Sequence, residues 1–123
     1  MAKPMYVRFE TPKEVADKIY QLVQMAKETG KVKKGTNEVT KVLERGDAKF
    51  VVMAEDVDPP EILAHIPMLC EEKKIPYGYV PSKVSLGNAV GLEKQSASVA
   101  IVDFGKAKPL MDEIEQALKN LKK

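Results

Sequence analysis

The apolar run Phe-Val-Val-Met-Ala at 50–54 constrains the fold of this chain more than any other feature. A short, continuous apolar run is typical of a strand that is covered on both faces. Helical and strand patterns then alternate from end to end, with helical spacing at 15–26, 39–43, 62–70 and 110–121 and strand patterns at 77–80 and 99–102. This alternation predicts an α/β protein, a single-domain three-layer α/β/α sandwich with a central mixed sheet.

Capping residues mark the expected ends of the first two helices. Thr11 followed by Pro12 predicts the start of the first helix, and Gly30 predicts its end. Thr36 or Asn37 is expected to cap a second, short helix that ends at Gly46.

A proline interrupts the third helical pattern. Asp58-Pro59 predicts the start of this helix, and Pro67 lies inside it. Because a proline in a helix interior removes one hydrogen bond and clashes with the preceding turn, we expect a kink or a break there. Ser82 is expected to cap a further short helix at 83–89.

Several classes of protein are excluded by composition. No stretch approaches the roughly 20 apolar residues that span a membrane, so we expect no membrane partner. The N-terminal residues contain no apolar run of signal-peptide length, which favours a cytoplasmic protein. The single cysteine, Cys70, can form neither an internal disulfide nor a multi-cysteine metal site, which indicates a reducing compartment.

Charge is segregated along a chain that is nearly neutral as a whole, with 20 Lys and Arg against 18 Asp and Glu. Residues 27–49 carry seven basic groups against four acidic ones, a local charge of +3. Residues 54–72 carry six acidic groups and no Lys or Arg, a local charge of −6. This pattern favours a partner that is polyanionic at one surface only, although solvated helix faces explain the same counts.

The segment at 35–41 is the strongest candidate for recognition of a nucleic acid. It lies at an expected helix start, where free backbone N–H groups favour a phosphate, and Gly35 permits close approach of another backbone. Asn37 offers a donor and an acceptor to a base edge, whereas Glu38 can only accept, as from guanine N1 and N2. Lys41 lies one turn after Asn37, and Arg45 extends the same face. The plainer alternative is that these residues only cap the helix and complement its dipole.

A second candidate region covers 80–96. Lys83 and Lys94 are suited to phosphates, and Leu92 is suited to stack under an unpaired base. RNA that is read at splayed bases needs such a mixture of apolar support and hydrogen-bond donors.

Three motifs, in this order and spacing, resemble one known family. They are Gly-Thr-Asn-Glu-Val-Thr-Lys at 35–41, Ala-Glu-Asp-Val-Asp-Pro at 54–59, and Val-Pro-Ser-Lys at 80–83 followed by Leu-Gly-Asn-Ala-Val-Gly at 86–91. Together they are similar to the family of the archaeal large-subunit ribosomal protein L-seven-Ae, over essentially the whole chain. The resemblance implies that residues 1–123 form a single α/β/α domain that binds kink-turn RNA. A kink-turn is a helix–bulge–helix element with tandem sheared G·A pairs and a flipped-out nucleotide.

The resemblance also implies roles for individual residues. Asn37, Glu38 and Lys41 are expected to recognise the guanines of the G·A pairs in the major groove. Further positions are expected at the backbone (Gly35, Thr36), near a phosphate (Arg45), around the flipped nucleotide (Asp58, Ile62, Lys83, Lys94) and in the loop that covers the bulge (Leu92, Glu93, Lys94). No catalytic residue, metal or cofactor is implied.

The partners that the resemblance implies are kink-turn and kink-loop RNAs. They include 23S rRNA in the large ribosomal subunit, box C/D and H/ACA guide RNAs, and the RNA of ribonuclease P. Core proteins of the guide RNA particles are expected as protein partners, and the free protein is expected to be a monomer in the cytoplasm.

Three other readings of the residues remain open. Glu55, Asp56 and Asp58 follow a buried strand, where carboxylates can bind Mg²⁺, although Asp58 is better explained as a helix cap. Cys70 with His65 would be a nucleophile and base, but Cys70 lies on an apolar stripe. The acidic segment 54–72 is suited to docking a protein, which would make the chain an interaction module with only non-specific RNA binding.

Overall fold

The computed structural model describes residues 12–56, 63–91 and 94–121, with side chains to residue 119. Its strands are β1 (Lys31–Lys34), β2 (Phe50–Ala54), β3 (Tyr77–Val80) and β4 (Ser98–Asp103). Its helices are α1 (Lys13–Thr29), α2 (Thr36–Arg45), α3 (Ile66–Lys73), α4 (Lys83–Ala89), the 3₁₀ turn η2 (Gly105–Ala107) and α5 (Lys108–Leu121).

The four described strands form one mixed sheet in the order β1-β4-β2-β3. β4 is antiparallel to both of its neighbours, and β2 and β3 are parallel. The register pairs Lys34 with Val99, Met53 with Ser98 and Ala54 with Val80. The ends of β1, β2 and β3 and the start of β4 therefore lie at one edge of the sheet.

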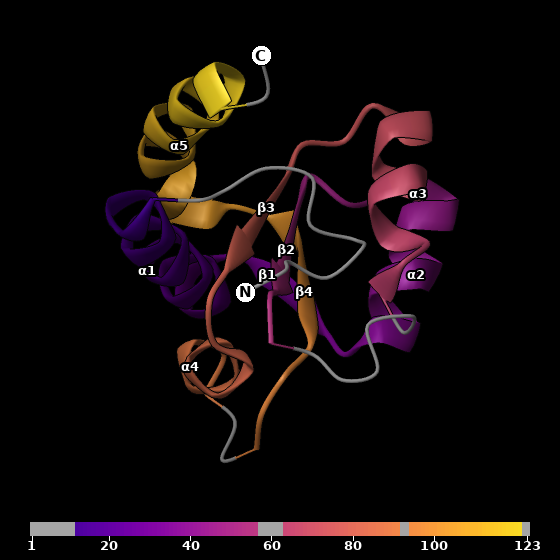
Figure 1. The fold of residues 1–123 in the computed structure, drawn as a ribbon, viewed down its shortest axis with the longest axis horizontal. Helices are drawn as coiled ribbons and strands as arrows, with labels where there is room; N and C mark the ends of the chain where they lie inside the picture. Colours follow the sequence, from indigo (N-terminus) through magenta and orange to yellow (C-terminus); the bar gives the residue numbers. More distant parts are fainter. Residues whose placement is uncertain (1–11, 57–62, 92–93, 122–123) are drawn as a thin grey trace.

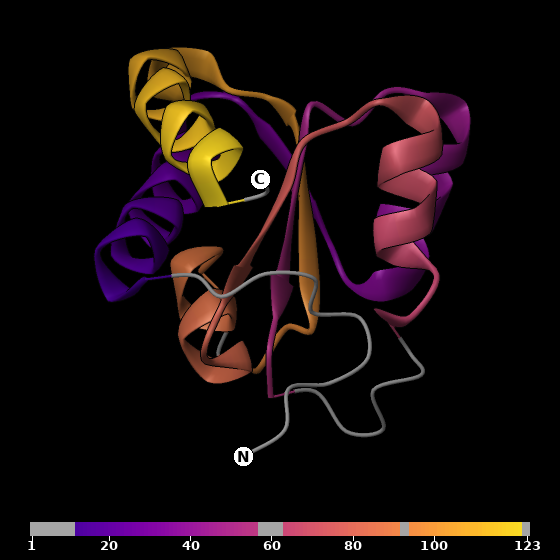
Figure 2. The same cartoon turned by 45° about the horizontal axis from the view of Figure 1, so that its top comes forward.

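Helices cover both faces of this sheet. α1, α4 and α5 lie on one face, and α2 and α3 lie side by side on the other (Figures 1 and 2). All residues of β2 and β3 are buried, including Tyr77 and Tyr79, whose rings meet edge to face at 5.9 Å. The predicted α/β/α sandwich with a mixed sheet is confirmed.

The helical spacing at 15–26 predicts a core-facing stripe of Val15, Ile19, Leu22 and Ala26, and the structure differs from it in part. Val15 is only half-buried, whereas Ala16 and Val23 join Ile19 and the other predicted positions in the core. Pro12 occupies the N-cap position rather than the first turn. Gly30 ends the helix as predicted, and Thr11 lies outside the described residues.

α3 begins beside the proline that the sequence singled out. The helix starts at Ile66 and has Pro67 in its first turn, where a missing N–H costs no helical hydrogen bond. The predicted interruption is thus a helix start. Cys70 is buried on the inner side, in agreement with a structural cysteine, and the expected start at 58–61 lies outside the described residues.

The sequence did not predict β1. Its residues are Lys-Val-Lys-Lys, of which only Val32 is partly buried, so the hydrophobic signal is a single residue. Among the described strands β1 lies at the edge of the sheet, and its exposed lysines oppose the addition of another strand. The strand carries part of the basic segment 27–49 to the start of α2.

None of the helices in the described ranges is long and apolar enough to cross a bilayer.

Candidate functional site

The start of α2 is anchored to the start of β4. Gly35 is the N-cap residue, with φ at 90°, and its N–H donates to the carbonyl oxygen of Ser98 at 3.1 Å. The hydroxyls of Thr36 and Ser98 lie 3.3 Å apart. The prediction that Thr36 or Asn37 caps this helix is wrong, because α2 makes no side-chain capping bond. Asn37 lies in the first turn instead, and its amide is not engaged in a capping bond.

The outer face of α2 carries the predicted recognition residues. Asn37, Glu38, Lys41 and Arg45 are all exposed, while Val39, Val42 and Leu43 bind the helix to the core. The Lys41 ammonium lies 3.9 Å from a Glu38 carboxylate oxygen, and the two side chains are 68% and 49% exposed. Exposed pairs at such distances stabilise a fold by about 1 kcal/mol or less, so both groups can exchange their partner for a ligand at little cost.

A groove opens beside this face. It has a volume of about 450 Å³ and is lined by Thr36, Asn37, Thr40, Lys41 and His65. His65 precedes α3, and its Nε2 lies 2.9 Å from the Thr40 hydroxyl. Two of the predicted recognition residues, Asn37 and Lys41, thus face a cavity that neither helix forms alone.

Lys83 and the segment that begins at Lys94 pack together along α4, at the same edge of the sheet. The Lys83 N–H donates to Asp56 Oδ1 at 2.8 Å, and the Lys83 carbonyl accepts from the Ser96 N–H at 3.0 Å. A Cβ at Gly87 would collide with the carbonyl of Lys94, so this glycine lets the segment after residue 93 pack directly on α4. Lys94 is exposed and Lys83 is half-buried.

A tyrosine fixes the start of α4. The Tyr20 hydroxyl accepts from the Ser82 N–H at 3.1 Å and lies 3.3 Å from the Ser82 carbonyl, to which it donates. Burial raises the pKa of Tyr20, so the phenol keeps the proton that it donates. Ser82 caps α4 as predicted, since its side chain accepts from the Ser85 N–H at 3.2 Å.

The structure therefore gathers two groups of predicted residues at one edge of the sheet: Gly35, Thr36, Asn37, Glu38 and Lys41 at the start of α2, and Lys83 and Lys94 beside α4. Arg45 is not among them, because it ends α2, which runs back along the sheet toward the start of β2. Asp58, Ile62, Leu92 and Glu93 lie outside the described residues. Ser98 and Thr40, which the sequence reasoning missed, join α2 to the sheet and to the residue that precedes α3. The spacing of Thr36 and Thr40, one helical turn, was the available signal for Thr40.

The geometry of the described residues supports neither a metal site at the acidic residues after β2 nor a catalytic pair of Cys70 and His65. Asp56 is engaged by the start of α4, and within residues 12–56, 63–91 and 94–121 no group of three His, Cys, Asp or Glu side chains could hold a metal ion. Cys70 is buried, whereas His65 is exposed and bonded to Thr40. Another cavity of about 450 Å³ borders Cys70, Tyr77 and Leu118, away from the gathered residues.

An α/β/α domain that gathers amide, carboxylate and basic side chains at one edge of its sheet is suited to an RNA ligand. Residues 17–111 match the model of the Ribosomal protein L7Ae/L30e/S12e/Gadd45 family, and the chain belongs to that family. A solved structure, named as a Giardia lamblia 15.5kD RNA binding protein, is similar at a TM-score of 0.86. It is 30% identical, over 98% of this chain and 99% of that chain. The chain accordingly has an RNA-binding fold and, as expected, is not an enzyme.

Proposed function

We propose that this protein recognises and stabilises kink-turn and kink-loop RNA. The observation that carries the proposal is the exposed face of α2, where Asn37, Glu38 and Lys41 stand together on a turn anchored at Gly35. An amide, a carboxylate and an ammonium on one turn match the donors and acceptors of a guanine edge better than they match a phosphate backbone.

The presence of Glu38 favours recognition of RNA bases over a purely electrostatic attraction to the phosphate backbone. A carboxylate among cations repels phosphates, but it accepts hydrogen bonds from guanine N1 and N2. We assign Glu38 and Asn37 to the guanines of the tandem sheared G·A pairs and Lys41 to guanine O6 or N7. The bend of a kink-turn opens the major groove, which is otherwise too deep and narrow for side chains to read.

The neighbouring residues take supporting roles in this proposal. Gly35 and Thr36 lie against the RNA backbone, and Arg45 neutralises a phosphate. Asp58, Ile62, Lys83 and Lys94 surround the flipped nucleotide, and Leu92, Glu93 and Lys94 form the loop over the bulge.

Recognition of kink-turn RNA would serve in several ribonucleoprotein particles. We place the protein among the archaeal members of its family, in the large ribosomal subunit with 23S rRNA, and as the primary RNA binder of box C/D and H/ACA guide particles and of ribonuclease P. In the guide particles it would act beside their core proteins, which carry the chemistry.

A gel-shift titration tests the proposal. The protein is titrated against a kink-turn RNA and against a twin whose tandem G·A pairs are changed to Watson–Crick pairs, at two salt concentrations. Tight binding to the kink-turn with little binding to the twin is expected. Equal binding to both, lost at high salt, would contradict the proposal and would instead favour an interaction module with non-specific RNA binding.

A further inference from the structure

The groove between α2 and the start of α3 contains a titratable side chain that has no role in the recognition described above. His65 lines it together with Asn37 and Lys41, and its side chain is exposed. It is also the only histidine among the 123 residues.

The hydrogen bonds around Thr40 fix which imidazole nitrogen carries a proton. The Thr40 hydroxyl donates its single hydrogen to the carbonyl of Thr36 at 2.8 Å, because a carbonyl can only accept. The same hydroxyl oxygen must therefore accept at 2.9 Å from Nε2 of His65. Nε2 thus holds a hydrogen in both the neutral and the charged imidazole.

The other nitrogen, Nδ1, is left for a ligand. Within the described parts of the chain it makes no hydrogen bond. Neutral Nδ1 is an acceptor, whereas protonated Nδ1 is a donor on a cation, which suits a phosphate oxygen. The bond from Nε2 to Thr40 holds the ring in one position while this change occurs.

The charged side chains around the groove determine whether protonation of His65 strengthens or weakens the binding of a phosphate. Lys41, from α2, is the one other charged side chain that lines the groove in the described ranges, and it pairs with Glu38 at 3.9 Å. On the side of α3, the first acids after His65 in the described sequence are Glu71 and Glu72, six and seven residues further on. A phosphate bound in the groove would therefore meet the Lys41 ammonium and the protonated imidazole together.

We infer that His65 is a proton-linked RNA contact, which binds a phosphate of the kink-turn through Nδ1 when the imidazole is charged. This inference rests on the proposed function of the same surface. Since imidazole is the only side chain that ordinarily changes charge between pH 5 and 8, binding of RNA takes up protons in that range and strengthens as the pH falls.

The test compares the wild-type protein with His65→Gln, whose amide keeps a donor for Thr40 but does not titrate. Met68→Gln is the matched control, because Met68 lies on α3 and is 61% exposed. Affinity for the kink-turn RNA and for its Watson–Crick twin is measured at pH 8 and pH 5.5, each at several salt concentrations.

We expect the wild type and Met68→Gln to bind the kink-turn about two- to fivefold more tightly at pH 5.5 than at pH 8, as for one added exposed charge pair. Their salt dependence should also steepen by about 0.7–0.9 in log–log slope at pH 5.5, the value for one additional neutralised phosphate. His65→Gln should show neither change. A purely structural role of His65 would lower affinity equally at both pH values and would leave the slope unchanged.

The two possible failures are distinguishable. If the wild type prefers the kink-turn over its twin but His65→Gln has the same pH and salt dependence as the wild type, the inference is overturned and the proposed function stands. A flat wild-type pH profile overturns it equally. If the wild type fails to prefer the kink-turn at pH 8, the proposed function is overturned and the inference with it.

Discussion

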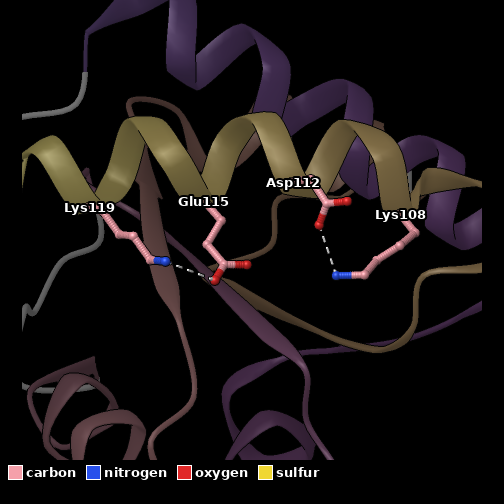
Figure 3. A network of polar contacts seen from close by, with 4 residues as sticks. All are labelled: Lys108, Asp112, Glu115 and Lys119. Atoms are coloured by element: carbon pink, nitrogen blue, oxygen red, sulfur yellow. Dashed lines mark hydrogen bonds and ion pairs between the residues drawn. The ribbon is translucent and has the colours of Figure 1, made fainter.

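The exposed charges of α2 and α5 are nearly balanced in number but differ in arrangement. α2 carries two basic and two acidic residues, and the described side chains of α5 include two basic and three acidic ones. On α5 the charges pair along the helix at four-residue spacing, with Lys108 and Asp112 at 3.0 Å and Glu115 and Lys119 at 3.8 Å (Figure 3). On α2 the Lys41 ammonium lies 3.9 Å from Glu38 at three-residue spacing, and Arg45 pairs at 3.8 Å with Asp47, which lies beyond the helix.

The difference shows that a charge count does not locate a binding surface. The surroundings distinguish the two helices: α2 follows a strand of three lysines, begins at a glycine tied to β4, and borders a groove shared with His65. The charges of α5 complement one another along a helix that packs on α1. We therefore assign the charges of α2 to a ligand and those of α5 to the solvated surface.

The largest expected effect is a loss of RNA affinity on substitution of α2 residues, with no loss on substitution of the same residue types in α5. Glu38→Ala and Lys41→Ala should each weaken kink-turn binding by about 1–3 kcal/mol, the usual contribution of a good base contact. Glu115→Ala and Lys119→Ala remove the same residue types from α5 and should leave affinity unchanged. Equal losses on both helices, measured by gel shift, would mean that the protein responds to charge and not to bases.

The anchor of α2 is tested at the two glycines that flank the helix, both of which have a positive φ. Gly35 and Gly46 have φ of 90° and 76°, and each would have open space around an added Cβ. Gly46→Ala should lower the free energy of unfolding by about 1–2 kcal/mol, the cost of a left-handed helical residue. Gly35→Ala should cost more, because its φ of 90° with ψ of 143° is a conformation that essentially only glycine adopts. Urea denaturation measures this loss, and RNA binding should weaken only in Gly35→Ala. If Gly46→Ala weakens binding as much, the site depends on the whole helix rather than on its anchored start.

The basic strand β1 should contribute through charge and not through base contacts. Lys33→Ala should reduce affinity by less than the changes on α2 and should lower the log–log salt slope by about 0.7–0.9. Titrations at four salt concentrations measure the slope. A loss of discrimination between the kink-turn and its Watson–Crick twin would contradict this role for Lys33.

The smallest effect is expected on α5. Lys108→Ala removes a pair four residues apart, and also the ammonium 5.6 Å from the centre of the Phe104 ring. Thermal unfolding at low salt should show a loss of about 0.3–0.5 kcal/mol, as for exposed helix pairs, with no change in RNA affinity. A larger loss would mean that these charges support the fold more than their exposure indicates.

The sequence predicted those parts of the fold that have a strong local signal. The uniformly apolar run of β2 and the periodic stripes of α1, α2 and α5 identified their own elements. β1 was missed because three of its four residues are exposed lysines, and only its pairing with β4 makes it a strand. The start of α2 was misassigned because Gly35 replaces a side-chain cap with a backbone bond to Ser98, which is distant in sequence.

The candidate site was predicted as residue types but not as an arrangement. The motif at 35–41 indicated Asn37, Glu38 and Lys41, which the structure places together on one exposed turn. The groove forms only where α3 packs on α2, which brings His65 to Thr40 although the two residues are 25 positions apart in the sequence. No local pattern contains that contact.

Recognition of guanine by Glu38 is the central claim, and a double-substitution cycle tests it most directly. Affinity is measured for the wild type and Glu38→Ala, each with a kink-turn RNA and with the same RNA carrying inosine in place of the guanines of the G·A pairs. Inosine lacks the N2 amine that the carboxylate is proposed to accept from. We predict that inosine weakens wild-type binding but has little further effect on Glu38→Ala, with a coupling of about 1 kcal/mol. Additive losses, with no coupling, would contradict the claim that Glu38 reads the base.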